Sequence, residues 1–321
     1  MDSQEIYDKV RGHYSAVSQR TSPEYGSTVA KSFGYSEKEL AGISQEANLG
    51  LSCGNPLAIA SICEGETVID LGSGAGFDAF LASNKVGPSG KVIGVDMNKD
   101  MLAKSNKIKI ETGKTNVEFV ESGITDMAVI ESGIAHCIIS NCVINLVPAA
   151  EKTLVFKEMF RLLKPGGRLA ISDIMAKKPL PEALRSDMAM YVGCISGASE
   201  AYEYQKFLED AGFREILITD TKCDLNVYIQ TNDDGSNKAD YCIPPALGKA
   251  ETEKDGEASS DYCTAGISSR AANCCAAENS YVSLTQGNLN DWVDLRKQSI
   301  AMRAATRHVQ GLENELALRL M

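Results

Sequence analysis

Short runs of apolar and β-branched residues alternate with amphipathic segments through the middle of the chain. Five runs, each bounded by turn residues, have the length and composition of β-strands: 67–72, 91–96, 117–122, 135–140 and 168–173. Segments with apolar residues at helical spacing lie between them, at 77–85, 100–111 and 152–163. This alternation predicts a mostly parallel sheet that is covered by helices on both faces.

Further elements are expected on either side of this core. The segment 202–213 predicts a helix that ends at Gly212. The runs 215–220 and 224–230 are expected to close the sheet as an antiparallel hairpin, which makes seven strands in all. The first 45 residues have the pattern of one or two helices, which we expect to form a lid over the sheet.

The character of the chain changes after residue 231. Residues 232–280 are polar, small and acidic, which predicts a flexible linker. Helical spacing returns in 288–320, around the residues Trp292, Val293, Ile300, Val309 and Leu316. The predicted organisation is therefore a helical lid at 1–50, a main α/β domain at 51–231, the linker at 232–280 and a C-terminal helix at 281–321. Such a helix would dock on the domain or pair with a second copy.

Composition and charge narrow the class of protein. The chain is 44% hydrophobic and 23% charged, and none of its apolar runs approaches the roughly 20 residues of a membrane helix. The N-terminal segment is polar and lacks the apolar stretch of a secretory signal, so we expect a cytoplasmic protein. A net charge of −11 argues against nucleic acid or an anionic membrane as the main partner.

The chain is rich in cysteine and poor in histidine. In a reducing compartment, its ten cysteines are more readily explained as ligands or redox groups than as structural disulfides. The three histidines (His13, His136 and His308) are too few for most histidine-based metal or acid–base sites. The chemistry of the protein is therefore expected to depend on sulfur.

A glycine-rich turn, VIDLGSGAGFD at 68–78, joins a predicted strand to a predicted helix. Its glycines allow a tight turn and the close approach of a ligand, whose anionic group can meet the N–H groups of the helix terminus. The motif alone is weak, because similar turns serve NAD enzymes or merely connect a strand to a helix. Its G-x-G-x-G spacing differs from the G-x-G-x-x-G of dinucleotide-binding proteins.

Two acidic residues favour S-adenosylmethionine as the cofactor. Asp70 ends the strand before the turn, where it could meet an amino group, and Asp96 ends the next strand, where it could bind two ribose hydroxyls. S-adenosylmethionine has an amino acid head group and a ribose but no pyrophosphate, so it suits this acidic turn better than a dinucleotide. The candidate cofactor contacts are Asp70, Gly72, Ser73, Gly74, Gly76, Asp96, Met97, Thr125, Asp126, Ser140 and Asn141. The alternative is a doubly wound domain without this cofactor.

Several longer stretches resemble a known family. LLKPGGRLAISD at 162–173 is similar to the helix–turn–strand before the fifth strand of class I methyltransferases, which have a Rossmann-like seven-stranded sheet. NLGLSCGNP at 48–56, SNCVINL at 140–146 and MYVGCISGA at 190–198 resemble blocks of the arsenite S-adenosylmethionine methyltransferases. The resemblance covers roughly residues 35–230. It implies methyl transfer to thiol-bound trivalent arsenic in detoxification, with arsenite or arsenic–thiol complexes as substrate and a thiol reductant of the glutathione or thioredoxin type.

This chemistry explains the residue types. Trivalent arsenic is soft and thiophilic, and its lone pair can attack the sulfonium methyl without the removal of a proton. A general base is therefore unnecessary, in keeping with the few histidines. The resemblance implies that Cys53 and Cys194 are the arsenic-binding and catalytic thiols. Cys142 also matches the family, but its position at a strand end is equally consistent with a packed cysteine.

The remaining cysteines have less certain roles. Cys63 and Cys137 lie in apolar surroundings and are expected in the core, whereas Cys223 could be either core or functional. Residues 1–52 contain no cysteine, unlike longer family members, which leaves the family's disulfide cycle open here. The family also uses a cysteine after the helix predicted at 202–213, and Cys242 and Cys263 are both candidates for this arsenic ligand.

The adjacent pair Cys274 and Cys275 could capture arsenic or act as a redox pair. It could equally consist of incidental thiols, or of thiols that bind zinc adventitiously. Its spacing to the preceding Cys263 is not that of a structural zinc site.

Two rival functions remain. One is a methyltransferase of the same fold that acts on a quinone, a sterol or a thiol, and the paired cysteine blocks argue against it. The other is a protein that sequesters arsenic or a metal and has lost cofactor binding. The intact glycine-rich turn with Asp70 and Asp96 argues against this second rival.

Overall fold

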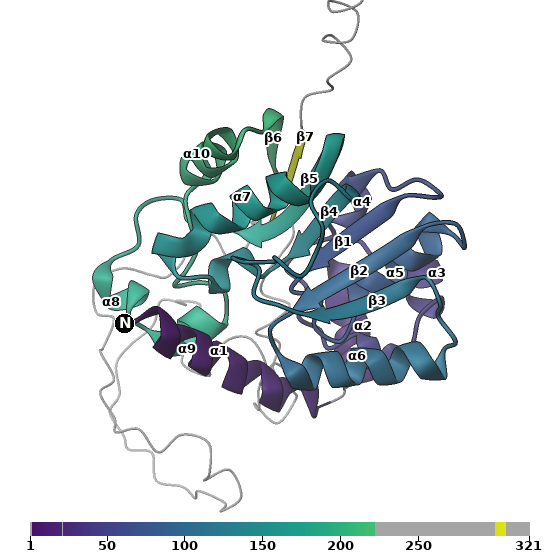
Figure 1. Cartoon of the computed structure of the whole chain (residues 1–321). Helices are drawn as coiled ribbons and strands as arrows, with labels where there is room; N and C mark the ends of the chain where they lie inside the picture. Colours follow the sequence, from purple (N-terminus) through teal and green to yellow (C-terminus); the bar gives the residue numbers. More distant parts are fainter. Residues whose placement is uncertain (1, 21, 222–298, 306–321) are drawn as a thin grey trace, which may run out of the picture.

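A computed structural model describes residues 2–20, 22–221 and 299–305 of the 321-residue chain (Figure 1). Its centre is a sheet with the strand order β3-β2-β1-β4-β5-β7-β6. The strands are β1 (Thr67–Leu71), β2 (Lys91–Asp96), β3 (Val117–Glu121), β4 (Ala135–Asn141), β5 (Leu163–Ile174), β6 (Arg214–Asp220) and β7 (Ser299–Ala305). β1 to β5 are parallel, and β7 is antiparallel to both of its neighbours. The predicted class I α/β architecture, with a parallel five-stranded core, is confirmed.

Alternation along the strands produces the two faces of the sheet. In β1, Val68 belongs to one buried cluster, and Ile69 and Leu71 belong to the other. The first face is covered by α4 (Leu57–Ala60) and α5 (Phe77–Val86), and the second by α7 (Lys152–Leu162) and α10 (Ala201–Ala211). Because both faces are buried, the central strands are apolar at successive positions, as expected for a parallel sheet.

Local signals set several helix ends. α6 (Lys99–Glu111) starts at Asn98, whose side chain accepts hydrogen bonds from the backbone N–H groups of Asp100 and Met101 at 3.0 and 3.2 Å. α10 ends at Gly212, whose φ of +107° favours glycine, so the predicted helix end is confirmed.

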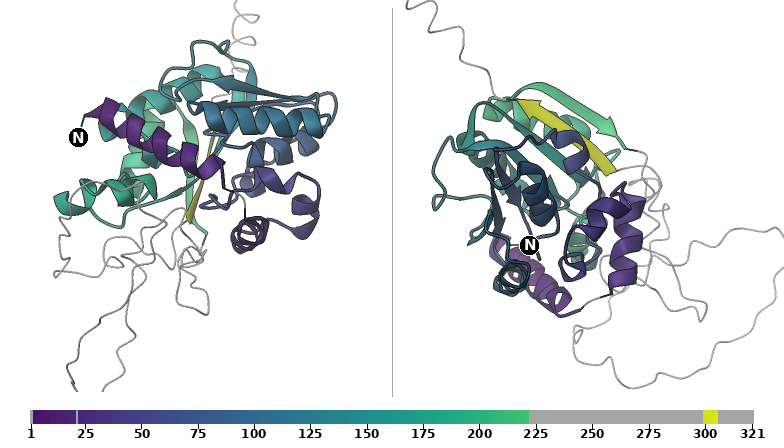
Figure 2. Two further views of the ribbon diagram at one scale, coloured as in Figure 1. Left: turned by 90° about the horizontal axis from the view of Figure 1, so that it is seen from below. Right: turned by 90° about the vertical axis from the view of Figure 1, so that its right-hand side faces the viewer.

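The N-terminal part of the chain is helical, as predicted. It contains α1 (Ser3–Ser18), α2 (Pro23–Ser32), α3 (Glu37–Ala41) and the short 3-10 helix η1 (Gln45–Ala47). α1 packs against α6 and against α9 (Met188–Val192), which follows α8 (Glu182–Arg185) (Figure 2). Two more 3-10 helices, η2 (Ile144–Leu146) and η3 (Ala149–Glu151), lie between β4 and α7. None of the helices in the described part of the chain is both long and apolar enough to span a bilayer.

The prediction of a C-terminal helix over 281–321 is wrong at residues 299–305. These residues form β7, which lies between β5 and β6 and pairs with both (Figure 2). Backbone pairing on two sides outweighs the high helix propensity of alanine, methionine and arginine in this stretch. The first strand of the predicted hairpin is confirmed as β6, but the strand next to β6 in the sheet is β7. The predicted partner at 224–230, the linker 232–280 and the rest of 281–321 lie outside the described residues.

Candidate functional site

The glycine-rich turn leaves β1, contacts the end of β2 and enters α5. The backbone N–H of Ser73 donates to Val95 O at 3.0 Å, and that of Gly74 donates to Asp96 Oδ2 at 2.8 Å. Gly74 has a φ of +52°, and a Cβ there would have no atom closer than Met101 Sδ at 3.9 Å, so its backbone faces open space. A Cβ on Gly76 would lie 2.7 Å from the Phe80 ring, so packing explains this glycine.

A cavity of about 270 Å³ opens beside this turn, at the carboxyl ends of the parallel strands. Six of the residues predicted to contact the cofactor line it: Gly72, Gly74, Asp96, Met97, Thr125 and Asn141. Asp70 and Ser73 line a smaller hollow that shares Gly72, Gly74 and Asn141 with the first one. Gly76, Asp126 and Ser140 line neither of these two cavities.

The sequence-based prediction missed several cavity residues, among them a group on α1. Tyr7, Arg11 and Tyr14 line the cavity from this helix. Asn98 lines it as well, and its side-chain amide donates to Arg11 O at 2.9 Å. The sequence contained a signal for Asn98, because it lies two residues after Asp96, which ends the strand, and therefore at the place where an N-cap residue of the next helix is expected. For α1, the apolar periodicity predicted a helix but did not show which part of the sheet this helix covers.

Buried carboxyl groups surround the turn. Burial, followed by the nearby charges of Asp78 and Asp96, raises the pKa of Asp70 well above its usual range. Burial raises the pKa of Asp78 to about 6 and also raises that of Asp96. Oδ2 of Asp70 and Oγ of Ser73 are buried without a hydrogen-bond partner among the described residues. These groups favour a ligand that carries positive charge and hydrogen-bond donors, and S-adenosylmethionine, with its sulfonium and ammonium groups, fits them.

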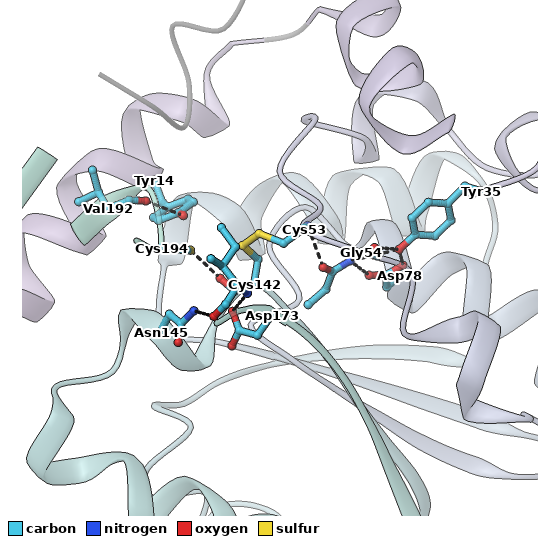
Figure 3. Close-up of a disulfide and its surroundings, with 12 residues drawn as sticks. Tyr14, Tyr35, Cys53, Gly54, Asp78, Cys142, Asn145, Asp173, Val192 and Cys194 are labelled. Carbon is cyan, nitrogen blue, oxygen red and sulfur yellow. Dashed lines mark hydrogen bonds between the residues drawn. A yellow bond between two sulfur atoms is a disulfide. The ribbon is translucent and has the colours of Figure 1, made fainter. Parts of the chain in front are cut away.

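A hydrogen-bonded cluster holds the Cys53 loop against the end of β4 (Figure 3). The Cys53 backbone N–H donates to Asn141 Oδ1 at 3.1 Å, and Asn141 Nδ2 donates to Gly54 O at 3.0 Å. Asn141 Nδ2 also donates to Asp78 Oδ2 at 2.9 Å, and the Tyr35 hydroxyl donates to Asp78 Oδ1 at 2.7 Å. Asn141 therefore links the cysteine loop to the cavity that it lines.

Three cysteines from distant parts of the chain meet beside this cavity. The sulfurs of Cys53, Cys142 and Cys194 all lie within 4.8 Å of one another, and all three residues are buried. Cys53 and Cys142 form a disulfide with a Cα–Cα distance of 5.4 Å, and the Cys194 thiol donates to Cys142 O at 3.0 Å (Figure 3). The structure thus shows the cluster in its oxidised form; reduction of the disulfide would release two thiols beside the thiol of Cys194.

The backbone at two of these cysteines is strained. Cys142 has a φ of +61° and Cys194 a φ of +63°, in the left-handed region that non-glycine residues rarely adopt. Residues in such conformations cost about 1–3 kcal/mol each and are concentrated at functional sites. The outliers are thus a second observation, independent of sulfur proximity, that favours a functional role for this cluster.

The structure tests several expectations about individual cysteines. It brings the predicted pair Cys53 and Cys194 together and places Cys142 with them, a partner that the sequence left undecided because Cys142 follows a strand. Cys137 is buried, as predicted. The prediction that Cys63 is a core residue is wrong: Cys63 is exposed, because it lies in the turn between α4 and β1 and its backbone N–H donates to Glu66 Oε2. Five further cysteines lie outside the described residues: Cys223, Cys242, Cys263, Cys274 and Cys275.

Comparisons with known proteins find methyltransferases. The family profile described as "Methyltransferase domain" matches residues 62–212. An arsenite methyltransferase of Halobacterium salinarum is 38% identical over 234 residues, which are 73% of this chain and 59% of that protein. An arsenite methyltransferase of Aquipseudomonas alcaligenes is 39% identical over 169 residues, which are 51% of this chain and 48% of that protein.

A crystal structure titled as an arsenic(III) S-adenosylmethionine methyltransferase from Chlamydomonas reinhardtii is 29% identical. The match covers 62% of this chain and 67% of that one, with a TM-score of 0.48. The chain spans about half to three fifths of the length of the two curated relatives. Residues 62–212 therefore belong to the methyltransferase family that this profile describes, and the chain as a whole is similar in sequence to the arsenite methyltransferases.

Proposed function

We propose that this protein transfers methyl groups from S-adenosylmethionine to trivalent arsenic bound by Cys53, Cys142 and Cys194, as an enzyme of arsenic detoxification. The observation that carries the proposal is the three-sulfur cluster, whose members lie within 4.8 Å of one another. Cys142 itself lines the larger cavity, together with Gly74 and Asp96 of the proposed cofactor site. A thiol-bound substrate and a cofactor would therefore share one space.

The residues around the cavity fit the parts of the cofactor. The carboxylate of Asp96 would accept from the ribose hydroxyls, and the unpartnered oxygen of Asp70 would accept from the ammonium group. Met97 and Thr125 would contact the adenine ring, and Gly74 allows the backbone to approach the head group. The bound cofactor supplies an electrophilic methyl group on a sulfonium.

The thiols supply the other half of the chemistry. Three thiolates satisfy the soft, three-coordinate arsenic(III) centre and leave its lone pair available for attack on the methyl group. The attack would form an arsenic–carbon bond, break the sulfonium–methyl bond to leave S-adenosylhomocysteine, and convert arsenic(III) to arsenic(V), which the thiol reductant would return to arsenic(III). No proton is removed from arsenic in that step, so the protein's task is to bury the thiolates and to orient them. The Asn141 hydrogen bonds keep the Cys53 segment at the edge of the cavity.

The disulfide adds a redox requirement. Two electrons and two protons from a thiol reductant, of the glutathione or thioredoxin type, would convert the Cys53–Cys142 disulfide to two thiols before arsenic binds. A cytoplasmic location, where such reductants are kept reduced, fits this requirement.

The test is an assay with S-adenosylmethionine, arsenite and a thiol reductant, in which arsenic species are separated by chromatography. We expect methylated arsenicals with the reductant and none with the oxidised protein alone. Cys53→Ser and Cys194→Ser should lose methylation and keep cofactor affinity, because a hydroxyl is a poor ligand for arsenic. Wild-type rates in Cys53→Ser would refute the proposal, and arsenic binding without any product would support sequestration instead.

A further inference from the structure

Lys152 is a fully buried lysine at the start of α7, with only 1% of its surface exposed. Its Nζ donates to Ser199 Oγ at 2.9 Å and to the carbonyl oxygen of Gly197. It also lies 3.5 Å from Asn145 Oδ1. The buried carboxylate of Asp173 offsets part of the cost of burying this ammonium group. A lysine held in this way is a specific structural feature, because lysine is almost never fully buried unless it is paired.

The groups around Lys152 belong to the two segments that carry Cys142 and Cys194. Asn145 lies in η2, three residues after Cys142, and Gly197 lies three residues after Cys194. Asn145 is itself fixed, since its Nδ2 donates to Ile174 O at 2.6 Å and its Oδ1 accepts from the Tyr204 hydroxyl at 3.1 Å. The ammonium group therefore joins the two cysteine-bearing segments through Asn145, Gly197 and Ser199.

The backbones of these segments are also in direct contact. A Cβ at Gly197 would overlap the carbonyl oxygen of Asn145 and lie 3.0 Å from its carbonyl carbon. The segment after Cys194 thus packs closely on the turn after Cys142, and Lys152 spans the junction.

We infer that Lys152 is a positioning residue that holds the Cys194 sulfur against the Cys53–Cys142 pair for the capture of arsenic. The inference rests on the proposed function and adds a residue to it. Cys53 and Cys142 are held near each other independently of Lys152, by the Asn141 hydrogen bonds to the Cys53 loop. Loss of the lysine should therefore affect the third sulfur selectively, and with it the binding of a ligand that needs three sulfurs.

The test compares two arsenic probes on the reduced, full-length protein. Arsenite takes up to three thiolates, whereas phenylarsine oxide can take only two. Lys152→Met keeps the length of the side chain and removes its hydrogen bonds, and Lys157→Met is the matched control, because Lys157 is an exposed lysine of the same helix. We expect arsenite affinity to fall roughly tenfold in Lys152→Met, as is common for residues coupled in one network. Affinities for phenylarsine oxide and for S-adenosylmethionine should stay within about twofold of wild type.

A double-mutant cycle with Cys194→Ser separates positioning from general stability. In the Cys194→Ser background, Lys152→Met should change arsenite affinity no further, because the sulfur that it positions is gone. The inference is wrong if the effect is the same in both backgrounds, if phenylarsine oxide binding falls equally, or if Lys152→Met matches Lys157→Met. Wild-type protein that methylates no arsenic would refute the proposed function instead.

Ser199→Ala provides a second variant, should Lys152→Met fail to fold. It keeps the lysine and removes one of its hydrogen bonds, at 2.9 Å. We expect a smaller loss, about threefold, again confined to arsenite and dependent on Cys194. A loss that persists in the Cys194→Ser background would overturn the inference.

Discussion

At the scale of single residues, the role of a cysteine depends on what surrounds its sulfur. Cys142 and Cys137 both come from β4 or its end, yet Cys137 is enclosed by the core, and Cys142 lines the cavity and contacts two other cysteines. Cys63 differs from both, since it is exposed in a turn. The same side chain is thus a packing group, a candidate ligand or a surface thiol within one domain.

Cys142→Ser should abolish arsenite methylation, because it removes one of three thiolates and leaves a hard hydroxyl in its place. Cofactor affinity should stay within about threefold, since serine is nearly isosteric with cysteine at the cavity wall. Chromatography of arsenic species and calorimetry with S-adenosylmethionine measure the two effects. Cys63→Ser is the control and should behave as wild type, because the side chain is exposed. Normal product formation by Cys142→Ser would remove this residue from the site.

The buried carboxyl groups make a prediction about pH. Burial raises the pKa of Asp70 and Asp96, and raises that of Asp78 to about 6, so protonation is easier in the folded protein than in the unfolded chain. These groups therefore lower the stability of the ligand-free protein as pH rises from the unfolded pKa through the folded one. A cationic ligand favours the ionised forms and should reverse that loss.

Affinity for S-adenosylmethionine should accordingly rise by about threefold or more between pH 5.5 and pH 7.5. Isothermal calorimetry at both values measures it, with circular dichroism to show that the protein stays folded. S-adenosylhomocysteine lacks the sulfonium charge and should depend less on pH. Equal affinities for S-adenosylmethionine at both values would mean that these carboxyl groups do not meet the charged cofactor.

At the scale of elements, α1 buries Ile6 and Val10 in the core and also makes polar contacts near the cavity. The Tyr7 hydroxyl donates to Glu151 Oε2 at 2.8 Å, and the Tyr14 hydroxyl donates to Val192 O at 3.1 Å. These bonds connect α1 to η3 and to the end of α9, close to the Cys194 segment. The helix is therefore placed to close the cavity and to contact the substrate side as well.

Tyr7→Phe should loosen α1 without changing the shape of the cavity wall. The variant loses one hydrogen bond to a carboxylate, worth about 1.5–3 kcal/mol, and we expect S-adenosylmethionine to dissociate roughly threefold to tenfold faster. Stopped-flow displacement measures this rate. Lys9→Ala, which removes an exposed ion pair on the same helix, should leave the rate unchanged. If S-adenosylmethionine dissociates from Tyr7→Phe and from Lys9→Ala at the same rate, α1 does not act as a lid.

At the scale of the whole molecule, the sheet brings together three cysteines that are far apart in the chain. Cys53 and Cys142 are separated by 89 residues, and Cys194 comes from a segment beyond β5. Parallel strands place the loops after β1 and β4 at one edge, and the segments before α4 and after α9, which carry Cys53 and Cys194, close over that edge. The three described sulfurs suffice for three-coordinate arsenic.

The variant with both Cys242→Ser and Cys263→Ser should therefore methylate arsenite at close to the wild-type rate. An arsenite titration with product analysis measures the rate at limiting and saturating substrate. A rate that is depressed at every arsenite concentration would show instead that one of these cysteines is a ligand. Cys194→Ser, which removes one of the described sulfurs, provides the comparison for complete loss.

Local pattern was enough to predict much of this protein. Residues 67–71 and 91–96 alternate between two faces and end in turn residues, so their strands were predicted from neighbours in the sequence alone. Neighbouring residues were also enough to predict the glycine-rich turn, the positions of Asp70 and Asp96 at strand ends, and the helix end at Gly212. Each of these depends on backbone conformation and side-chain chemistry within a few residues.

Other features were decided only by tertiary structure. The strand at 299–305 depends on pairing with β5 and β6. The exposure of Cys63 depends on the turn before β1, and the burial of Lys152 depends on hydrogen-bond acceptors more than 40 residues away in the sequence. The grouping of Cys142 with Cys53 and Cys194 was also decided by tertiary structure. Contacts over such separations arise from the packing of the whole sheet and its helices, and a local pattern carries no information about which distant segment will supply the partner.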